Sequence, residues 1–284
     1  MQNKIFLIFK LIRLHAPTGF LLTFFPAVFG QILAAKNEVN LILTFTLFIG
    51  SILARGAGCI INDLLDKNFD RQVFRTKNRP LANNSLSTNF ALTILIILLF
   101  VCFFILLTLS TIAIYIGLVA ILMIALYPLT KRITNLPQLF LGLTFNLGCL
   151  IGYASVSNSI SIPAFLMYLS CCMWTIGYDT IYAFMDLEDD KIIGVKSMAI
   201  LLEKHHPIIW LMGAYCAFLT LFILANLLTG IKLNILTLTV ATFILMWQLV
   251  TLKLADPQNC LVKFKANNYV GVMLIMSLVW GSFA

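Results

Sequence analysis

The most constraining feature of the sequence is a series of long apolar runs with almost no charged residue inside them. A helix needs about 20 apolar residues to cross a bilayer. Runs that approach this length cover residues 17–35, 41–61, 89–109, 111–129, 137–156, 161–184, 208–229, 233–252 and 269–284. Apolar residues make up 61% of the chain and charged residues 11%, whereas soluble domains have roughly 45–50% and about 25%. These values exclude a soluble enzyme and favour an all-α, polytopic membrane protein.

The apolar runs leave no room for an appended soluble domain. We therefore expect one integral-membrane domain over residues 1–284, with about nine transmembrane helices in one bundle. The third and fourth runs are nearly continuous, and Ser110 and Thr111 form the polar turn that would separate them.

The distribution of Lys and Arg predicts the orientation of these helices. With nine spans, sixteen of the 19 basic residues fall on one side, only Lys36 and Lys232 fall on the other, and Arg55 lies inside the second span. Basic residues concentrate in cytoplasmic loops. We therefore expect a multi-pass protein of a bacterial inner membrane whose N-terminus is cytoplasmic. The net charge of +8 then reflects topology and not a nucleic-acid partner.

Acidic residues are concentrated in two short windows, which hold eight of the 11 Asp and Glu residues. The first window contains Asn62, Asp66 and Asp70 at a spacing of four, with Asp63 beside them. If the second span continues as a helix, these three residues share one face. Three arginines, Arg71, Arg75 and Arg79, follow at the same spacing.

The second window contains Asp179, Tyr182, Asp186 and Asp190, which also predict one helical face, and Lys191 follows it. Glu188 and Asp189 point away from that face. An ionised side chain at the bilayer centre costs about 2.5–3.5 kcal/mol, and like charges four residues apart repel. Two aligned acidic faces therefore need a cation or a wet cavity, and Mg²⁺ is usually held by carboxylates together with substrate phosphates.

Basic residues near these windows fit an anionic ligand. Lys131 and Arg132 end the fourth span after Tyr127, close to the membrane plane. Lys and Arg bind phosphate oxygens through charge-assisted hydrogen bonds. Both acidic faces and this basic pair lie on the predicted cytoplasmic side, which is the arrangement of a clamp for Mg²⁺ and a diphosphate.

These motifs resemble those of the UbiA superfamily of intramembrane aromatic prenyltransferases. Asn62-Asp63-x-x-Asp66-x-x-x-Asp70 is similar to the family's first aspartate motif, Asp186-x-x-x-Asp190 to the second, and Tyr127-x-x-x-Lys131 to its Tyr–Lys motif. The strings around Arg75–Arg79, Leu136–Gln138 and Tyr178–Tyr182 are similar to members that act on 4-hydroxybenzoate in ubiquinone synthesis. The likeness runs from about residue 11 to about residue 271.

The resemblance implies a helical bundle around a central cavity that opens to the cytoplasm and laterally to lipid. It also implies that polyprenyl diphosphate and 4-hydroxybenzoate are the substrates and that Mg²⁺ is the cofactor. The implied metal ligands are Asn62, Asp66, Asp70, Asp186 and Asp190; the diphosphate-binding residues are Arg71, Lys131, Arg132 and Lys191; the supporting residues are Asp63, Asp179, Tyr127 and Tyr182. Catalysis would depend on Asp66, Asp186, Asp190, Lys131 and Arg132.

The acceptor is the part of this hypothesis that the sequence leaves open. Arg13, at the cytoplasmic end of the first span, is our candidate for binding the carboxylate of the aromatic acid, although it could equally be a topology anchor. Haem, a naphthoate, homogentisate or a chlorophyll precursor would suit the same chemistry as acceptors. A cation-coupled transporter is the alternative from another class, but it predicts acids near the bilayer midplane, and here the acids cluster at one surface.

Overall fold

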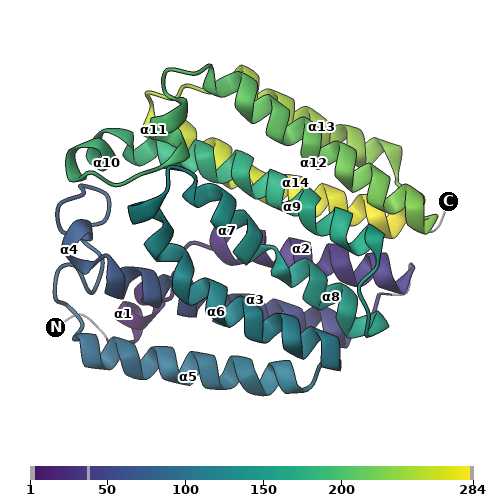
Figure 1. Ribbon diagram of the computed structural model, residues 1–284, viewed down its shortest axis with the longest axis horizontal. Coiled ribbons are helices and arrows are strands. Elements are labelled where there is room, and N and C mark those ends of the chain that lie inside the picture. The colour runs from purple at the N-terminus through teal and green to yellow at the C-terminus, as the bar shows by residue number, and fades with distance from the viewer. Residues whose placement is uncertain (1–3, 37–38, 282–284) are drawn as a thin grey trace.

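The computed structural model describes residues 4–36 and 39–281, and within these ranges every regular element is a helix. The elements are α1 (Lys4–Leu11), α2 (Thr18–Ala35), α3 (Leu41–Leu65), α4 (Lys67–Asp70), α5 (Thr88–Leu107), α6 (Thr111–Ile133), α7 (Pro137–Phe145), α8 (Leu147–Ser157), α9 (Ile162–Ala183), the 3₁₀ helix η1 (Phe184–Asp186), α10 (Leu187–Ile193), α11 (Met198–Leu202), α12 (Pro207–Thr229), α13 (Ile235–Val250) and α14 (Pro257–Gly281). The long helices run side by side, with short helices α4, α10 and α11 gathered at one end (Figure 1).

Within residues 4–36 and 39–281, six helical stretches are long and apolar enough to cross a membrane. They are α2, α3, α5, α6, the α7–α8 pair and α12. α13 is also apolar but has only 16 residues. The prediction of an all-helical, multi-pass membrane protein is therefore confirmed, whereas the count of nine spans stays a prediction.

Helix ends are set by local capping. The predicted break between the third and fourth apolar runs occurs where expected: α5 ends at Leu107, and the Ser110 hydroxyl accepts a hydrogen bond from the Ala113 amide at 3.3 Å. This is the usual capping interaction at a helix N-terminus. Ser87 and Ser161 cap α5 and α9 in the same way.

Two predicted spans differ from the observed helices. The fifth is divided at Asn146, whose side-chain amide donates 2.7 Å hydrogen bonds to the Gly142 carbonyl and to the Thr175 hydroxyl of α9. A side chain that bonds the backbone in this way competes with the regular helix. The last helix, α14, begins at Pro257, twelve residues before the predicted start at 269. The first half of α14 was not predicted from the apolar pattern because it contains polar residues. Two of these, Lys263 and Asn267, face the interior, where both are buried.

The main core is built around Trp174 of α9. Its indole stacks on Phe218 with centroids 5.2 Å apart, and its Nε1 donates to the Asn267 side chain at 2.7 Å. Side chains of α2, α8, α12, α13 and α14 complete this cluster, while α1, α3 and α5 share a smaller one. The polar hydrogen bond inside an apolar core satisfies the indole N–H, which would otherwise be costly to bury.

Helices α2 and α8 approach one another closely, and the approach depends on two glycines. A Cβ atom at Gly30 would lie 1.9 Å from the Cys149 carbonyl oxygen, and one at Gly152 would lie 2.0 Å from the Ala27 carbonyl oxygen. Small residues allow helix backbones to approach closely in membranes, where packing replaces the hydrophobic effect as the driving force. This contact fixes α8 against α2 on one side of the bundle.

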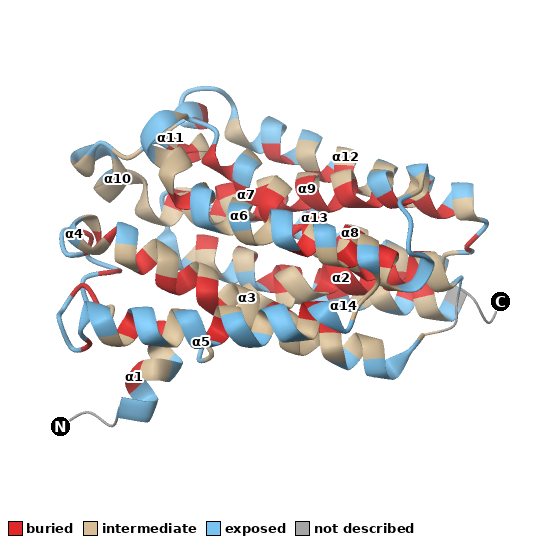
Figure 2. Cartoon of the chain, turned by 60° about the horizontal axis from the view of Figure 1, so that its bottom comes forward, coloured by how far each residue is buried: buried red, intermediate tan, exposed pale blue. Residues whose placement is uncertain are grey.

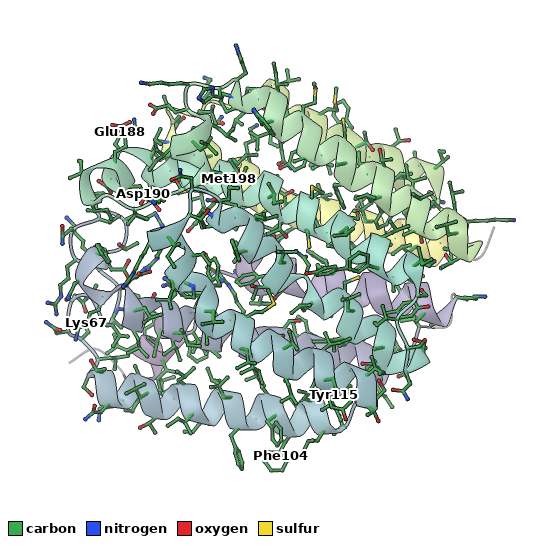
Figure 3. The ribbon with its side chains drawn as sticks, in the orientation of Figure 1. Lys67, Phe104, Tyr115, Glu188, Asp190 and Met198 are labelled. Carbon is green, nitrogen blue, oxygen red and sulfur yellow. The ribbon has the colours of Figure 1, made fainter. Side chains whose placement is uncertain are left out.

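The outer faces of the bundle remain apolar. Exposed residues follow the outside of α5 and α12 in Figure 2, and Phe104 and Tyr115 project away from the helices in Figure 3. Among them, Ile96 and Phe100 of α5 are 65% and 62% exposed. Large exposed aliphatic and aromatic side chains on a helix that is buried on one side only suit contact with lipid.

Candidate active site

A cavity of about 680 Å³ lies at the end of the bundle that carries α4, α10 and α11. Its lining comes from the long helices α2, α3, α6, α9 and α14, from the shorter helices α4, α7 and α10, and from the connections after α1, α4 and α10. Both predicted acidic windows reach it: Asn62, Asp66 and Asp70 from the first, and Asp179, Tyr182, Asp186 and Asp190 from the second.

The two acidic windows are not continuous helices, and the prediction of regular helical faces is wrong on this point. α3 ends at Leu65, and Asp66 caps it with φ −101° and ψ 7° before α4 begins. Asp186 occupies the equivalent junction between η1 and α10, with φ −109° and ψ 10°. This bridge conformation is common at active sites. Each bend turns the following carboxylate back over the cavity, so the residues converge although the helix does not continue.

Asp66 is the most enclosed carboxylate of the cavity wall. It is 1% exposed, forms an ion pair with Lys131, and lies 3.6 Å from the Arg132 guanidinium, while its Oδ1 atom has no hydrogen-bond partner. Burying an unpaired charge is very costly. The Lys131 ammonium, held at the end of α6, is therefore what permits a carboxylate at this position.

A second group of charges locks the first acidic segment to its surroundings. Asp63 is 1% exposed and receives hydrogen bonds from Arg13 at 2.5 Å and from Arg79 at 3.2 Å. Arg79 also donates to both carboxylate oxygens of Asp70, at 2.9 and 2.8 Å. These four alternating charges tie the end of α1, the end of α3 and the loop after α4 into one unit.

The second acidic segment has fewer partners. Arg75 forms a two-pronged contact with Asp186, with Nε donating to Oδ1 at 2.7 Å, and its guanidinium also donates to the Tyr182 hydroxyl at 2.8 Å. Asp190 has no ion pair with any residue that the structure describes. Burial, followed by the nearby charge of Asp186, raises the pKa of Asp190 to about 7. Asp190 lies nearer the bundle than Glu188 (Figure 3).

Three predicted phosphate-binding side chains lie outside the cavity lining. Residues 71–79 form turns, and in them Arg71 donates to the Ala82 carbonyl at 2.9 Å and to Asn84 at 2.7 Å. Lys191 is exposed and pairs with Glu188 at 2.9 Å and Glu203 at 2.7 Å. Arg132 bonds the Leu65 carbonyl at 2.8 Å. Only Lys131 of the four faces the cavity.

Arg75 lies in the cavity wall together with Tyr127. It was not among the predicted site residues. The signal that could have identified Arg75 is its place in the repeat of arginines after the first window. That repeat does not distinguish Arg75 from Arg71, because only the path of the loop decides which guanidinium turns inward.

Arg55 is another residue of the cavity wall that was not among the predicted site residues. It belongs to α3 and lines the cavity with its guanidinium 5.1 Å from the Phe145 ring, and its buried Nε has no hydrogen-bond partner. No ion pair involves it among residues 4–36 and 39–281. A lone arginine inside a spanning segment is expensive and marks a functional position, so the sequence did contain the signal.

The donor set of the cavity suits a hard divalent cation that arrives with an anionic substrate. Within the described ranges, no three His, Cys, Asp or Glu side chains cluster closely enough to hold a metal ion by themselves. Carboxylate and amide oxygens from both windows nevertheless face one space, and the buried Oδ1 of Asp66 has no partner. Mg²⁺ commonly takes only one or two carboxylates and completes its shell with phosphate and water. The residues therefore fit such an ion.

Comparison with known families gives a match over most of the chain. The family model described as the UbiA prenyltransferase family matches residues 23–277. The chain is 34% identical over 279 residues to a 4-hydroxybenzoate octaprenyltransferase of Enterobacter sp. strain 638, covering 98% of this chain and 96% of that one. It is 35% identical over 272 residues to the enzyme of the same description from Shewanella oneidensis, with coverage of 95% and 94%.

Solved structures show the same fold at lower sequence identity. The apo structure of a UbiA homolog from Aeropyrum pernix superposes with a TM-score of 0.77 at 21% identity, covering 92% of this chain and 97% of that chain. A UbiA homolog from Archaeoglobus fulgidus bound to DMAPP and Mg²⁺ superposes with a TM-score of 0.70 at 14% identity, covering 96% and 99%. With a family match over most of its length and relatives of 34–35% identity, this chain belongs to the UbiA prenyltransferase family and is a prenyl-transferring membrane enzyme.

Proposed function

We propose that this enzyme transfers a polyprenyl group from polyprenyl diphosphate to the ring carbon of 4-hydroxybenzoate that is ortho to the hydroxyl, in ubiquinone biosynthesis. The observation that carries the proposal is the cavity in which Asp66, Asp186, Asp190 and Lys131 converge from separate helices. Full-length relatives described as 4-hydroxybenzoate octaprenyltransferases support the choice of acceptor.

The two acidic segments would hold Mg²⁺ together with the diphosphate of the donor. The ligands would be Asn62, Asp66, Asp186 and Asp190, which all line the cavity. Bound Mg²⁺ would neutralise negative charge on the diphosphate as it leaves. Both carboxylate oxygens of Asp70 accept hydrogen bonds from one guanidinium nitrogen of Arg79, so we assign Asp70 to holding the loop after α4.

The basic side chains of the cavity would stabilise the departing diphosphate. The Lys131 ammonium and the Arg75 guanidinium are the candidates, because both face the cavity and both contact a metal-binding carboxylate. Donors that are already in place where charge develops stabilise a transition state without reorganisation. Apolar side chains below this level, such as Leu22 and Leu141, would keep water away from the allyl cation.

The acceptor carboxylate would bind Arg55 and not Arg13. Both guanidinium groups line the cavity, but that of Arg13 forms an ion pair with Asp63, whereas Arg55 has no ion pair among the described residues. A guanidinium binds a carboxylate through charge-assisted hydrogen bonds. An anionic acceptor would remove the cost of leaving this charge unpaired, and an uncharged acceptor would not.

The arrangement in the membrane is part of the same proposal. We propose one domain with nine spans, in which α9, α13 and α14 also cross the bilayer. α1 lies near one end of the bundle, and α14 finishes at the other (Figure 1), as an odd number of spans requires. By the distribution of basic residues, the cavity and the N-terminus face the cytoplasm of a bacterium, and the prenyl chain enters laterally from lipid.

The test of the proposed function is identification of the product by mass. Membranes that contain the full chain would be supplied with Mg²⁺, a polyprenyl diphosphate and a panel of acceptors comprising 4-hydroxybenzoate, a naphthoate, homogentisate and haem. We expect prenylated 4-hydroxybenzoate to be the main product. A different prenylated acceptor would reassign the substrate, and ion uptake without any prenylated product would favour a transporter.

Arg55→Gln and Arg13→Gln separate the two candidates for the acceptor carboxylate. Loss of a charge-assisted hydrogen bond costs about 1.5–3 kcal/mol, so we expect the KM for 4-hydroxybenzoate to rise roughly 10- to 100-fold in Arg55→Gln. Arg13→Gln should lower the thermal unfolding midpoint instead, since it leaves buried Asp63 with one fewer partner. The assignment fails if only Arg13→Gln raises the KM for the acceptor.

A further inference from the structure

The first helix, α1, differs from the long helices in its direction. It runs across the bundle and not along it, at the end that carries α4 (Figure 2). The helices against which α1 packs, α3 and α5, are both long and apolar enough to cross a membrane. Because these helices cross the bilayer, a helix that lies across their end follows the surface of the membrane.

The depth of α1 is set by the two residues that follow it. Ile12 lies against α3 at Gly56, where an added Cβ atom would be 3.2 Å from the Ile12 Cβ. Gly56 is nine residues before Leu65, the end of α3, which is about 14 Å by helical rise. The next residue, Arg13, pairs with Asp63 nearer that end. α1 therefore joins the bundle near the boundary between the hydrocarbon core and the headgroups.

Both sides of α1 carry large apolar side chains, but only one side is covered by protein. Leu7 and Leu11, four residues apart, are buried in the smaller core. Ile5, Phe6 and Phe9 are 62%, 51% and 47% exposed. An apolar face of this kind on a helix at the membrane surface enters the boundary between headgroups and acyl chains by about 5–10 Å.

The charges of α1 are all positive. Lys4 begins the helix and is exposed, and the Lys10 ammonium lies 4.8 Å from the centre of the Phe6 ring. Lys10 is also part of the cavity lining. Neither lysine forms an ion pair within residues 4–36 and 39–281. A lysine stem can follow an apolar surface while its ammonium reaches toward phosphates.

We propose that α1 is an interfacial helix that binds anionic phospholipids at the membrane surface. Lys4 and Lys10 contact the lipid phosphates, and the exposed side chains of Ile5, Phe6 and Phe9 lie among the upper parts of the acyl chains. Charge complementarity selects this lipid class, because anionic headgroups attract basic segments close to the membrane. The proposal requires only that the bundle crosses the bilayer, and it is independent of the acceptor and of the direction in which the cavity faces.

A protein partner fits this face less well than lipid. A stable protein interface buries about 800 Å² on each partner, whereas α1 has eight residues and three exposed large apolar side chains. The same three side chains are sufficient for a lipid contact, because the rest of the bundle already holds the protein in the membrane.

Photocrosslinking from α1 tests the proposal. In the full chain, p-benzoylphenylalanine replaces Phe6, and the protein is reconstituted in vesicles of phosphatidylcholine with a minor fraction of phosphatidylglycerol, irradiated and analysed by mass. One lysine near an anionic surface favours binding by about fivefold, so we expect lipid adducts in which phosphatidylglycerol is enriched about two- to fivefold over its share of the vesicle. Phe9 offers a second position for the photoreactive group if the first variant does not fold.

Two comparisons separate the charge from the apolar contact. Lys4→Gln combined with Lys10→Gln should leave the yield of lipid adducts unchanged but abolish the enrichment of phosphatidylglycerol. The matched control carries the photoreactive group in place of Phe104, which is 52% exposed on α5, a helix without basic residues. That control should react with the two lipids in their bulk proportion.

Two results would overturn the proposal. Adducts at Phe6 in the bulk lipid proportion, with both lysines present, would remove the recognition of anionic headgroups. Failure to form lipid adducts at Phe6 and Phe9, or crosslinks to a second copy of the chain in their place, would remove the lipid contact itself. Prenyl transfer in the same vesicles is assayed separately, so failure of the proposed function would not be mistaken for either result.

Discussion

The two acidic segments of the cavity have the same backbone design but different surroundings. Asp66 and Asp186 both lie at a junction between two helices, and their φ and ψ angles agree to within about 10°. In the first segment, Asp63, Asp66 and Asp70 are 1%, 1% and 7% exposed, and all three have basic partners. In the second, Asp186 has one basic partner, Arg75, and Asp190 has none within the described residues.

A charged site must keep its carboxylates stable inside the fold, and it must also leave carboxylates available to a ligand. The two segments differ in which of these two requirements they meet. A carboxylate can be buried only if cations offset the lost hydration, and the first segment meets this requirement through residues brought from α1, α6 and the loop after α4. The second segment leaves a carboxylate without a partner, which disfavours the charged form but keeps it available to a ligand. The first segment is thus held in place by the fold, and the second is completed by what binds.

The largest loss of activity should follow from Asp66→Ala, because this change removes a proposed metal ligand and also breaks a buried ion pair. Loss of a group that stabilises developing charge costs on the order of 10²–10³ in turnover. The same change leaves Lys131 without its partner in a largely enclosed position, at a cost of about 1–3 kcal/mol in unfolding free energy. Prenyl transfer in membranes and thermal unfolding in detergent should both decline. Near-normal turnover in Asp66→Ala and in Asp186→Ala would rule out the clamp.

Asp190→Asn should separate activity from stability. We expect turnover to fall roughly 100-fold through loss of a charged ligand, but no loss of stability in the metal-free protein. The pKa of Asp190 is raised to about 7 in the folded chain, so above that pH the fold bears an unfavourable charge that Asn does not carry. The unfolding midpoint at pH 8 should be equal to or higher than that of wild type. A clear drop would mean that the second segment is also structural.

The same pKa predicts a pH dependence of metal binding. Metal ligands must be deprotonated, so the apparent affinity of a site falls as its ligand takes up a proton. Below about pH 7, the Mg²⁺ concentration for half-maximal binding should rise about tenfold per pH unit, whereas above pH 8 it should be constant. Calorimetric titration with prenyl diphosphate present would measure this, and Asp190→Asn should remove the dependence. An unchanged profile in that variant would contradict the assignment.

The smallest effects should come from Arg71→Ala and Lys191→Ala. Both residues were predicted from the sequence to bind diphosphate, but neither lines the cavity. The exposed ion pairs of Lys191 contribute about 0–1 kcal/mol to stability, and Arg71 bonds only the Ala82 carbonyl and Asn84, so turnover should change less than about twofold in either variant. Lys131→Ala, assayed in parallel, should lose most of the activity. A large loss in Arg71→Ala would show that the loop after α4 closes over the bound donor.

Much of the fold could be predicted because the apolar runs of a membrane protein mark the positions of its helices. The break at Ser110 was predictable from a single polar turn, and the structure places a helix cap there. The division of the fifth run at Asn146 was not predictable, because it depends on a hydrogen bond to Thr175 of another helix. The early start of α14 escaped prediction because Lys263 and Asn267 face a polar interior that no local pattern reveals.

The sequence by itself determined the class of protein, the helices and the residue types that gather at one end. Apolar length and charge placement are local properties, and they act on each segment independently of the rest. The tertiary structure decided which charges meet. Arg75 faces the cavity and Arg71 does not, Arg13 forms an ion pair with Asp63, and Arg55 and Asp179 line the cavity without an ion pair among the described residues. These outcomes depend on how bent helix ends and loops pack, because charges interact through space and not along the chain.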